Sequence, residues 1–77
     1  MLTVKVLLDS IEKVKKFSSA VSKIAVDCEL VEGARIVDAK SIMGIFSMDL
    51  EKPMELQIHT DDRGVLKPLE PFFAEKP

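Results

Sequence analysis

The ten-residue segment Asp38-Ala39-Lys40-Ser41-Ile42-Met43-Gly44-Ile45-Phe46-Ser47 has the pattern of a strand end followed by the start of a helix. Ser41 stands where its side-chain oxygen can accept a hydrogen bond from a free backbone N–H group of the first helical turn. The pattern therefore predicts a short helix from Ser41 to about Met48. Gly44 lowers the helix propensity of this segment, which indicates that another element packs closely against it.

A strand and a long helix precede this segment. Apolar residues alternate with Thr3 and Lys5 in residues 2–8, as is typical of a strand. Asp9 or Ser10 can cap the helix that follows. No glycine or proline interrupts that helix, and spacings of three and four residues give it one apolar stripe, made of Ile11, Val14, Phe17, Val21 and Ile24.

Three further strands are indicated. Residues 26–30 alternate, with Cys28 on the inward face, and Arg35-Ile36-Val37 follows after a turn. Gly33 can take a positive φ at little cost, so these two strands are expected to form a hairpin. Residues 54–58 alternate again and predict the fourth strand.

The C-terminal segment, residues 60–77, gives the weakest pattern. Pro68 and Pro71 each lack a backbone N–H group and clash with the preceding helical turn, so an irregular tail is expected. Its apolar residues are expected to fold back onto another part of the molecule. Phe72 and Phe73 are expected either to fill a gap in the core or to dock on a second copy of the chain.

The order of the elements is β-α-β-β-α-β, followed by the irregular C-terminal segment. This order favours a single α+β domain over residues 1–77, in which both helices cover one face of a four-stranded antiparallel sheet. Such an arrangement is an open-faced sandwich.

Composition narrows the classes of function. Eleven Lys and Arg against thirteen Asp and Glu give a net charge of −2, which argues against nucleic-acid binding. No apolar run approaches the roughly 20 residues of a membrane span. The lone Cys28 cannot form an internal disulfide, which favours a reduced, cytoplasmic setting. One cysteine and one histidine far apart indicate no metal site, and no glycine-rich phosphate loop is present, so no cofactor is expected.

The segment from Ala39 to Met48 resembles the region around the regulatory serine of HPr, the small phosphocarrier of the bacterial phosphotransferase system. The Gly33 turn and the strand after Pro53 agree with this resemblance, which covers residues 2–60. The resemblance implies the HPr fold, with the irregular tail in place of the family's last helix, and a bacterial, cytoplasmic protein.

The chain departs from the family at the carrier site. The family places a histidine before the first helix, followed closely by an arginine and a proline, and the matching positions are Ser10, Glu12 and Lys13. Phosphohistidine transfer needs an imidazole nitrogen as the nucleophile, and Glu12 would repel the incoming phosphoryl group. Ser10 is therefore interpreted as a degenerate carrier position, and no catalytic residue is predicted.

Ser41 is the first candidate site residue. The resemblance implies that Ser41 is phosphorylated by HPr kinase/phosphorylase, with Lys40 as a counter-charge. A phosphate at a helix N-terminus is compatible with the helix, since it meets free N–H groups there. The alternative is that Ser41 serves only as a helix cap.

The second candidate site is apolar. In the family, the residues matching Ile42, Met43 and Phe46 contact partner proteins, and a flexible methionine and a flat aromatic ring suit that role. The alternative is packing in the core, where Ile45 and Met48 are expected.

These features favour a non-enzymatic HPr-like regulatory or protein-binding domain, whose partners would be HPr kinase/phosphorylase or a transcriptional regulator. A second hypothesis is a divergent phosphocarrier that uses Ser10 or His59, although a single histidine on a strand face is typically a surface residue. A third is a plain assembly module that forms a homodimer through its apolar tail.

Overall fold

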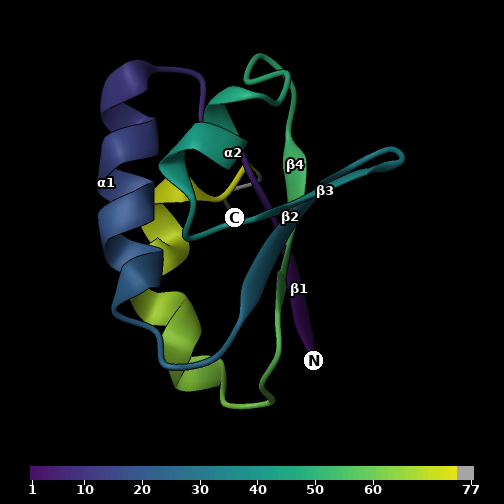
Figure 1. Cartoon of the computed structure of the whole chain (residues 1–77). Helices are drawn as coiled ribbons and strands as arrows, with labels where there is room; N and C mark the ends of the chain where they lie inside the picture. The colour runs from purple at the N-terminus through teal and green to yellow at the C-terminus, as the bar shows by residue number, and fades with distance from the viewer. Residues whose placement is uncertain (75–77) are drawn as a thin grey trace.

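The computed structural model describes residues 1–74 and shows an antiparallel sheet with helices packed on one of its faces (Figure 1). The elements are β1 (Leu2–Val6), α1 (Ile11–Ser22), β2 (Cys28–Glu32), β3 (Arg35–Asp38), α2 (Ile42–Phe46), β4 (Met54–Ile58) and the 3₁₀ helix η1 (Arg63–Phe72). The strands lie in the order β1-β4-β2-β3, and each neighbouring pair is antiparallel. The predicted sandwich, with its four-stranded antiparallel sheet, is confirmed.

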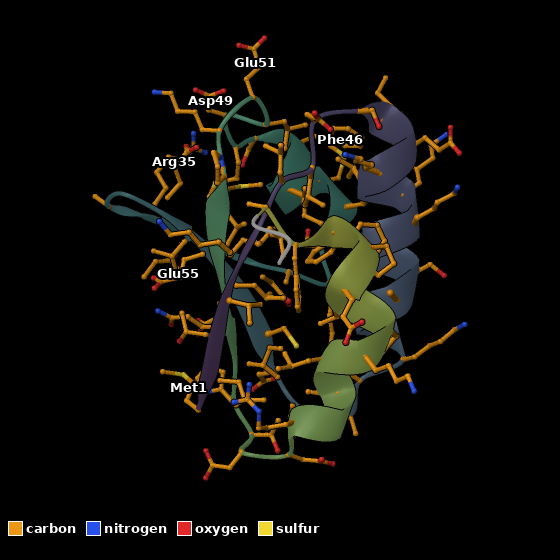
Figure 2. All side chains as sticks on the ribbon, turned by 180° about the vertical axis from the view of Figure 1, so that it is seen from behind. Met1, Arg35, Phe46, Asp49, Glu51 and Glu55 are labelled. Carbon is orange, nitrogen blue, oxygen red and sulfur yellow. The ribbon has the colours of Figure 1, made fainter. Side chains whose placement is uncertain are left out.

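The two central strands supply the middle of the core. Met54, Leu56 and Ile58 of β4 are buried against the helices, while the residues between them point to the other face of the sheet. Figure 2 shows Glu55 on that other face, away from the helices. The buried side chains of residues 1–74 form one continuous cluster. No helix in these residues is long and apolar enough to cross a bilayer.

Helix α1 begins after Ser10, whose Oγ accepts a hydrogen bond from the Lys13 N–H at 3.1 Å. Val14, Phe17 and Val21 form its buried face. Ile11 was expected in the same stripe, but its side chain is 64% exposed, so that prediction is wrong. At 3.6 residues per turn, Ile11 lies roughly 90° around the helix from the centre of the buried face.

The hairpin of β2 and β3 turns at Gly33, which has the predicted positive φ of 59°. Strand β2 begins at Cys28, two residues later than expected, and Cys28 is buried as predicted. The close packing predicted at Gly44 is also confirmed, because a Cβ atom on this residue would lie 3.3 Å from the Cβ of Val37 on β3.

Helix α2 is shorter than expected, since it ends at Phe46. Ile45 is fully buried, and Met48 just beyond the helix is 6% exposed, so both predicted core positions are confirmed. At the C-terminal end of the helix, the Ser47 N–H donates to the Gly44 carbonyl and the Met48 N–H donates to the Ile45 carbonyl.

The C-terminal segment is not irregular, which corrects the prediction for residues 63–72. Asp62 caps η1 by accepting a hydrogen bond from the Gly64 N–H at 2.9 Å. A 3₁₀ helix has three residues per turn, so side chains three positions apart share a face. Pro68 and Pro71 share an exposed face of η1, and another face is buried through Leu66, Leu69 and Phe72.

Phe72 is buried in the core. Of the two alternatives for this residue, filling a gap or docking on a second copy of the chain, the first is confirmed. Its ring packs edge-on against Phe17, with centroids 5.5 Å apart and an interplanar angle of 83°. The following residues cover part of the β1 edge, since the Leu7 N–H donates to the Phe72 carbonyl and the Ala74 N–H donates to the Lys5 carbonyl, each at 2.9 Å. The expectation for residues 75–77 lies outside the described residues.

Candidate functional site: the Ser41 helix

Ser41 lies at the N-terminal end of α2 with an exposed side chain. Its Oγ accepts a hydrogen bond from the Gly44 N–H at 3.2 Å, so the predicted helix cap is confirmed. The backbone is fixed on both sides, because the Ser41 N–H donates to the Asp38 carbonyl and the Ser41 carbonyl accepts from the Ile45 N–H. The hydroxyl is thus both a structural acceptor and accessible from solvent.

Three apolar side chains of α2 remain exposed: Ile42 at 36%, Met43 at 79% and Phe46 at 42%. We call them the α2 surface. They lie beside the capped Ser41, as expected from the sequence, while Ile45 alone of this helix is buried. The alternative that these three residues pack in the core is therefore excluded.

The α2 surface continues toward the start of α1. The two helices are in contact, and Figure 2 shows Phe46 at the end of the molecule where α1 begins. Ile11 is exposed at this end of α1, although its spacing in the sequence predicts it in the buried stripe. A helical wheel centred on Val14, Phe17 and Val21 would have placed Ile11 outside that stripe.

Lys40 does not supply the counter-charge that was expected beside Ser41. Its Nζ donates a hydrogen bond to the carbonyl of Ile24 at 2.6 Å. This carbonyl lies just past the C-terminal end of α1, where a cation is favourable because the last carbonyls of a helix lack partners. The ammonium group is therefore bound at α1.

Ser10 lies at the N-terminal end of α1 among ion pairs. Lys13 Nζ lies 2.9 Å from the Asp9 carboxylate, and Lys16 Nζ lies 2.8 Å from that of Glu12. Hydrogen bonds from these lysines hold the pKa of each carboxyl below its ordinary value. Both acids are therefore ionised at neutral pH, and they place two negative charges next to Ser10.

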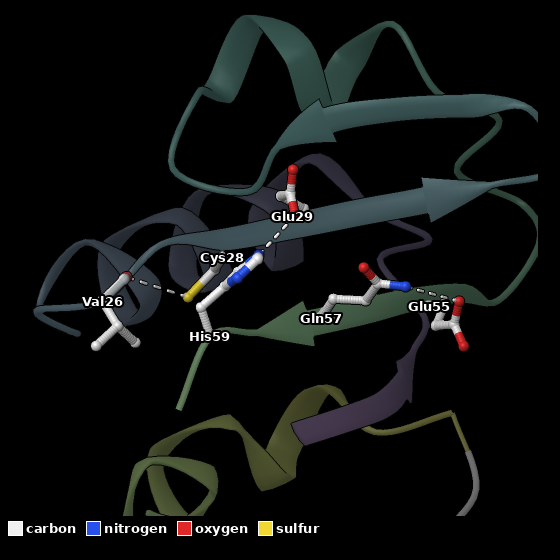
Figure 3. Close-up of polar contacts among 6 residues, drawn as sticks. All are labelled: Val26, Cys28, Glu29, Glu55, Gln57 and His59. Atoms are coloured by element: carbon white, nitrogen blue, oxygen red, sulfur yellow. Dashed lines mark hydrogen bonds and ion pairs between the residues drawn. The ribbon is translucent and has the colours of Figure 1, made fainter. Parts of the chain in front are cut away.

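His59 is on the sheet face away from the helices, so the structure does not bring it near Ser41 or Ser10. Its Nε2 lies 2.7 Å from Oε1 of Glu29 on the neighbouring strand (Figure 3). Asp27 and Asp38 line the same hollow as this pair. Acidic groups thus surround the only imidazole of the chain.

Cys28 is a buried structural residue. Its Sγ donates a weak hydrogen bond to the Val26 carbonyl at 3.7 Å (Figure 3). Burial is the main cause that raises the pKa of this thiol, which lowers its nucleophilicity at neutral pH. Within residues 1–74, no three histidine, cysteine or acidic side chains converge in a way that could hold a metal ion.

Comparisons with known proteins agree with this geometry. The chain is 25% identical to HPr-C-His from Thermoanaerobacter tengcongensis, with a TM-score of 0.77 and complete coverage of both chains. A phosphocarrier protein HPr from Bacillus anthracis shares the fold, with a TM-score of 0.67 at 23% identity, over 95% of this chain and 90% of the other. A search of curated proteins gave no match.

The family model described as "PTS HPr component phosphorylation site" matches residues 11–74, which is most of the chain. HPr is a phosphocarrier protein rather than a catalytic enzyme. With the fold, the element order and this match in agreement, the chain is a member of the HPr family of the phosphotransferase system.

Proposed function

We propose that this protein is a non-enzymatic regulatory domain of the HPr type that lacks histidine phosphotransfer, is phosphorylated on Ser41 and binds a protein partner through the α2 surface. One observation carries the proposal. An exposed serine hydroxyl that caps α2 lies directly beside three exposed apolar side chains. A helix cap alone would explain the serine but not the exposure of Met43 next to it.

Phosphorylation of Ser41 is compatible with the fold around it. The side chain projects into solvent, and the adjacent backbone N–H groups of α2 are donors for an anion. Because Lys40 is bound to α1, the phosphate would stay largely exposed. A partner with its own basic residues could then recognise the phosphate together with the α2 surface.

A carrier role at Ser10 is disfavoured by the chemistry around it. The serine has no imidazole beside it to act as a base, and its Oγ already accepts a hydrogen bond from the Lys13 N–H. The ionised carboxylates of Asp9 and Glu12 would repel a phosphoryl dianion, while the lysines that could attract it are paired with those acids.

A carrier role at His59 is disfavoured for a similar reason. Its Nε2 is held by Glu29, and a phosphoryl group there would add negative charge to a hollow that already contains the carboxylates of Asp27 and Asp38. The third hypothesis, dimerisation through the tail, loses its main support because Phe72 is buried within its own chain.

The partners we propose are HPr kinase/phosphorylase, which would modify Ser41, and a transcriptional regulator that would read the modified form. Both would act in a bacterial cytoplasm. The net charge of −2 is consistent with a protein partner rather than a nucleic acid.

The test is the intact mass of the protein after incubation with HPr kinase/phosphorylase and ATP, with the modified residue located by fragmentation. We expect one added phosphate, on Ser41, which Ser41→Ala abolishes. Ser47→Ala is the matched control, since Ser47 is an exposed serine at the other end of the same helix. No added mass under conditions that modify an authentic HPr would refute the regulatory role of Ser41.

A parallel incubation with enzyme I and phosphoenolpyruvate tests the carrier hypothesis. We expect no phosphorylation, whereas a phosphate on Ser10 or His59 would establish a carrier. The α2 surface is tested by the kinase KM of Met43→Lys, which should rise if this surface docks the kinase. Thr3→Lys, which adds the same charge at an exposed residue of the edge strand β1, should leave the KM unchanged.

A further inference from the structure

A second surface lies on the sheet face away from the helices, remote from α2. A hollow of about 370 Å³ opens there over the ends of the three strands β4, β2 and β3. Its lining includes the carboxylates of Asp27, Glu29 and Asp38, the imidazole of His59 and the side chain of Ile36. We call it the acidic hollow. No lysine or arginine of residues 1–74 lines it.

The polar groups of the acidic hollow are only partly satisfied within the chain. Glu29 is paired with His59, and Oδ1 of Asp38 accepts a hydrogen bond from the backbone N–H of Lys40 at 2.9 Å. Neither contact places a permanent positive charge in the hollow. An ammonium or guanidinium group from outside the chain would therefore find uncompensated carboxylates.

The hollow adjoins an open sheet edge. Strand β3 pairs with β2 only, and no other strand of residues 1–74 lies along its other side. The Ala39 N–H donates to the Cys28 carbonyl. Because hydrogen-bonded positions alternate in an antiparallel ladder, the N–H and C=O groups of Val37 point toward β2, and those of Ile36 point outward.

The outward backbone groups of Ile36 are available for pairing. The Asp38 carbonyl accepts from the Ser41 N–H, whereas Ile36 takes part in none of the backbone hydrogen bonds found outside the ladders of residues 1–74. The Ile36 side chain is 62% exposed on the same face as the hollow. Figure 1 shows the hairpin of β2 and β3 projecting beyond the rest of the molecule, so a further strand can approach this edge.

We propose that the open edge of β3 and the acidic hollow together bind an extended basic segment of a partner protein by antiparallel strand addition. Residues opposite each other in a sheet point to the same face. A residue paired with Asp38 would thus extend toward the hollow, and one paired with Ile36 would cover the exposed isoleucine. Read from its N-terminus, the segment carries a lysine or arginine, any residue, and then an apolar residue.

Charge selects this occupant over a second copy of the chain. In an antiparallel pair of β3 strands centred on Ile36, Asp38 of each copy would lie opposite Ala34 of the other, so a second copy would place no cation beside the hollow. Each copy also carries a net charge of −2, which disfavours self-association. A basic segment supplies the missing cation.

The experiment is an amide chemical-shift titration of the ¹⁵N-labelled full chain with the capped peptide Thr-Arg-Thr-Val-Thr. We expect saturable shifts centred on the amides of Ile36 and Asp38, and slower hydrogen exchange of the Ile36 amide. A peptide with glutamate in place of arginine, and one with the valine nitrogen methylated, should each bind at least about fivefold more weakly, since one removes a cross-strand charge pair and the other a ladder hydrogen bond.

Two protein variants complete the test. Ile36→Lys places a positive charge at the proposed edge and should weaken binding by about fivefold or more. Thr3→Lys is the matched control, because Thr3 is exposed on the opposite edge strand β1, and it should bind as the unmodified chain does.

Three outcomes would overturn the proposal: no shifts at millimolar peptide, equal effects of the two lysine variants, or shifts that grow with the concentration of the protein alone and so report self-association. None of these outcomes depends on Ser41 or on a kinase. The result is therefore independent of the proposed regulatory function.

Discussion

Phe72 is the residue whose replacement most directly tests the packing of the C-terminal 3₁₀ helix. The side chain is 7% exposed and packs edge-on against Phe17 of α1. Truncation of a buried phenylalanine to alanine costs about 3–5 kcal/mol. A domain of 77 residues is stable by roughly 4–12 kcal/mol, so Phe72→Ala should remove a large share of the free energy of unfolding.

The assay is urea unfolding followed by circular dichroism. The slope of the free energy with urea should stay constant, and the midpoint should fall. Phe46→Ala is the matched control, since Phe46 is an exposed phenylalanine, and it should lose less than about 1 kcal/mol. If Phe72→Ala is unfolded without urea, Phe72→Leu keeps most of the buried surface and should give a smaller, measurable loss.

The reasoning would be refuted if Phe72→Ala and Phe46→Ala had the same stability. Equal stabilities would mean that η1 is not docked on α1 in solution and that the core closes without it. The helices would then be loosely packed on the sheet, and the side chains of the α2 surface would be exposed for that reason.

Three further substitutions each test one local feature of the structure. Gly33→Ala should lower the free energy of unfolding by about 1–2 kcal/mol, because the turn holds this residue at a φ of 59°, and an unchanged urea midpoint would contradict this. Ser41→Ala should cost about 1 kcal/mol by removing the acceptor of the Gly44 N–H, whereas Ser41→Asp keeps an acceptor, so equal stability of the two variants would show that the cap contributes nothing. The pKa of Asp9 is below its ordinary value because of Lys13, so this carboxylate stabilises the fold above its unfolded-state pKa and loses that contribution as the pH falls through its folded-state pKa. Lys13→Met should raise the pKa of Asp9 toward the ordinary value in an NMR carboxyl titration, and no change would show that the ion pair does not persist in solution.

Features that depend on neighbours in the chain could be predicted from the sequence. Ser10 and Ser41 each stand before an apolar helical pattern, and both are helix caps. Gly33 lies between two alternating segments and has a positive φ. The two caps are hydrogen bonds between residues three positions apart, and the turn depends on the conformational freedom of Gly33 itself.

The 3₁₀ helix does not follow from periods of two and 3.6 residues, which predict only strands and α-helices. Leu66, Leu69 and Phe72 recur at spacings of three, and so do Pro68 and Pro71. This is the period of a 3₁₀ helix. It places both prolines on an exposed face of η1.

The contacts around the sites depend on tertiary structure. Lys40 binds the Ile24 carbonyl, a contact that exists only because α1 ends close to the start of α2. The acidic hollow likewise combines residues of β2, β3 and β4, whose register no local pattern determines. The sequence therefore predicted which residues of α2 are exposed, but not which charges surround them.

The meeting of the two ends of the chain has a consequence for synthesis on the ribosome. The Leu7 N–H bonds to the Phe72 carbonyl, and Val6 pairs with Phe73. A nascent chain that has emerged only as far as β4 lacks three of the side chains that close its core. The sheet can form early, but the finished domain has to wait for almost its last residues to leave the exit tunnel, and until then the apolar faces of α1 and β1 are open to chaperones.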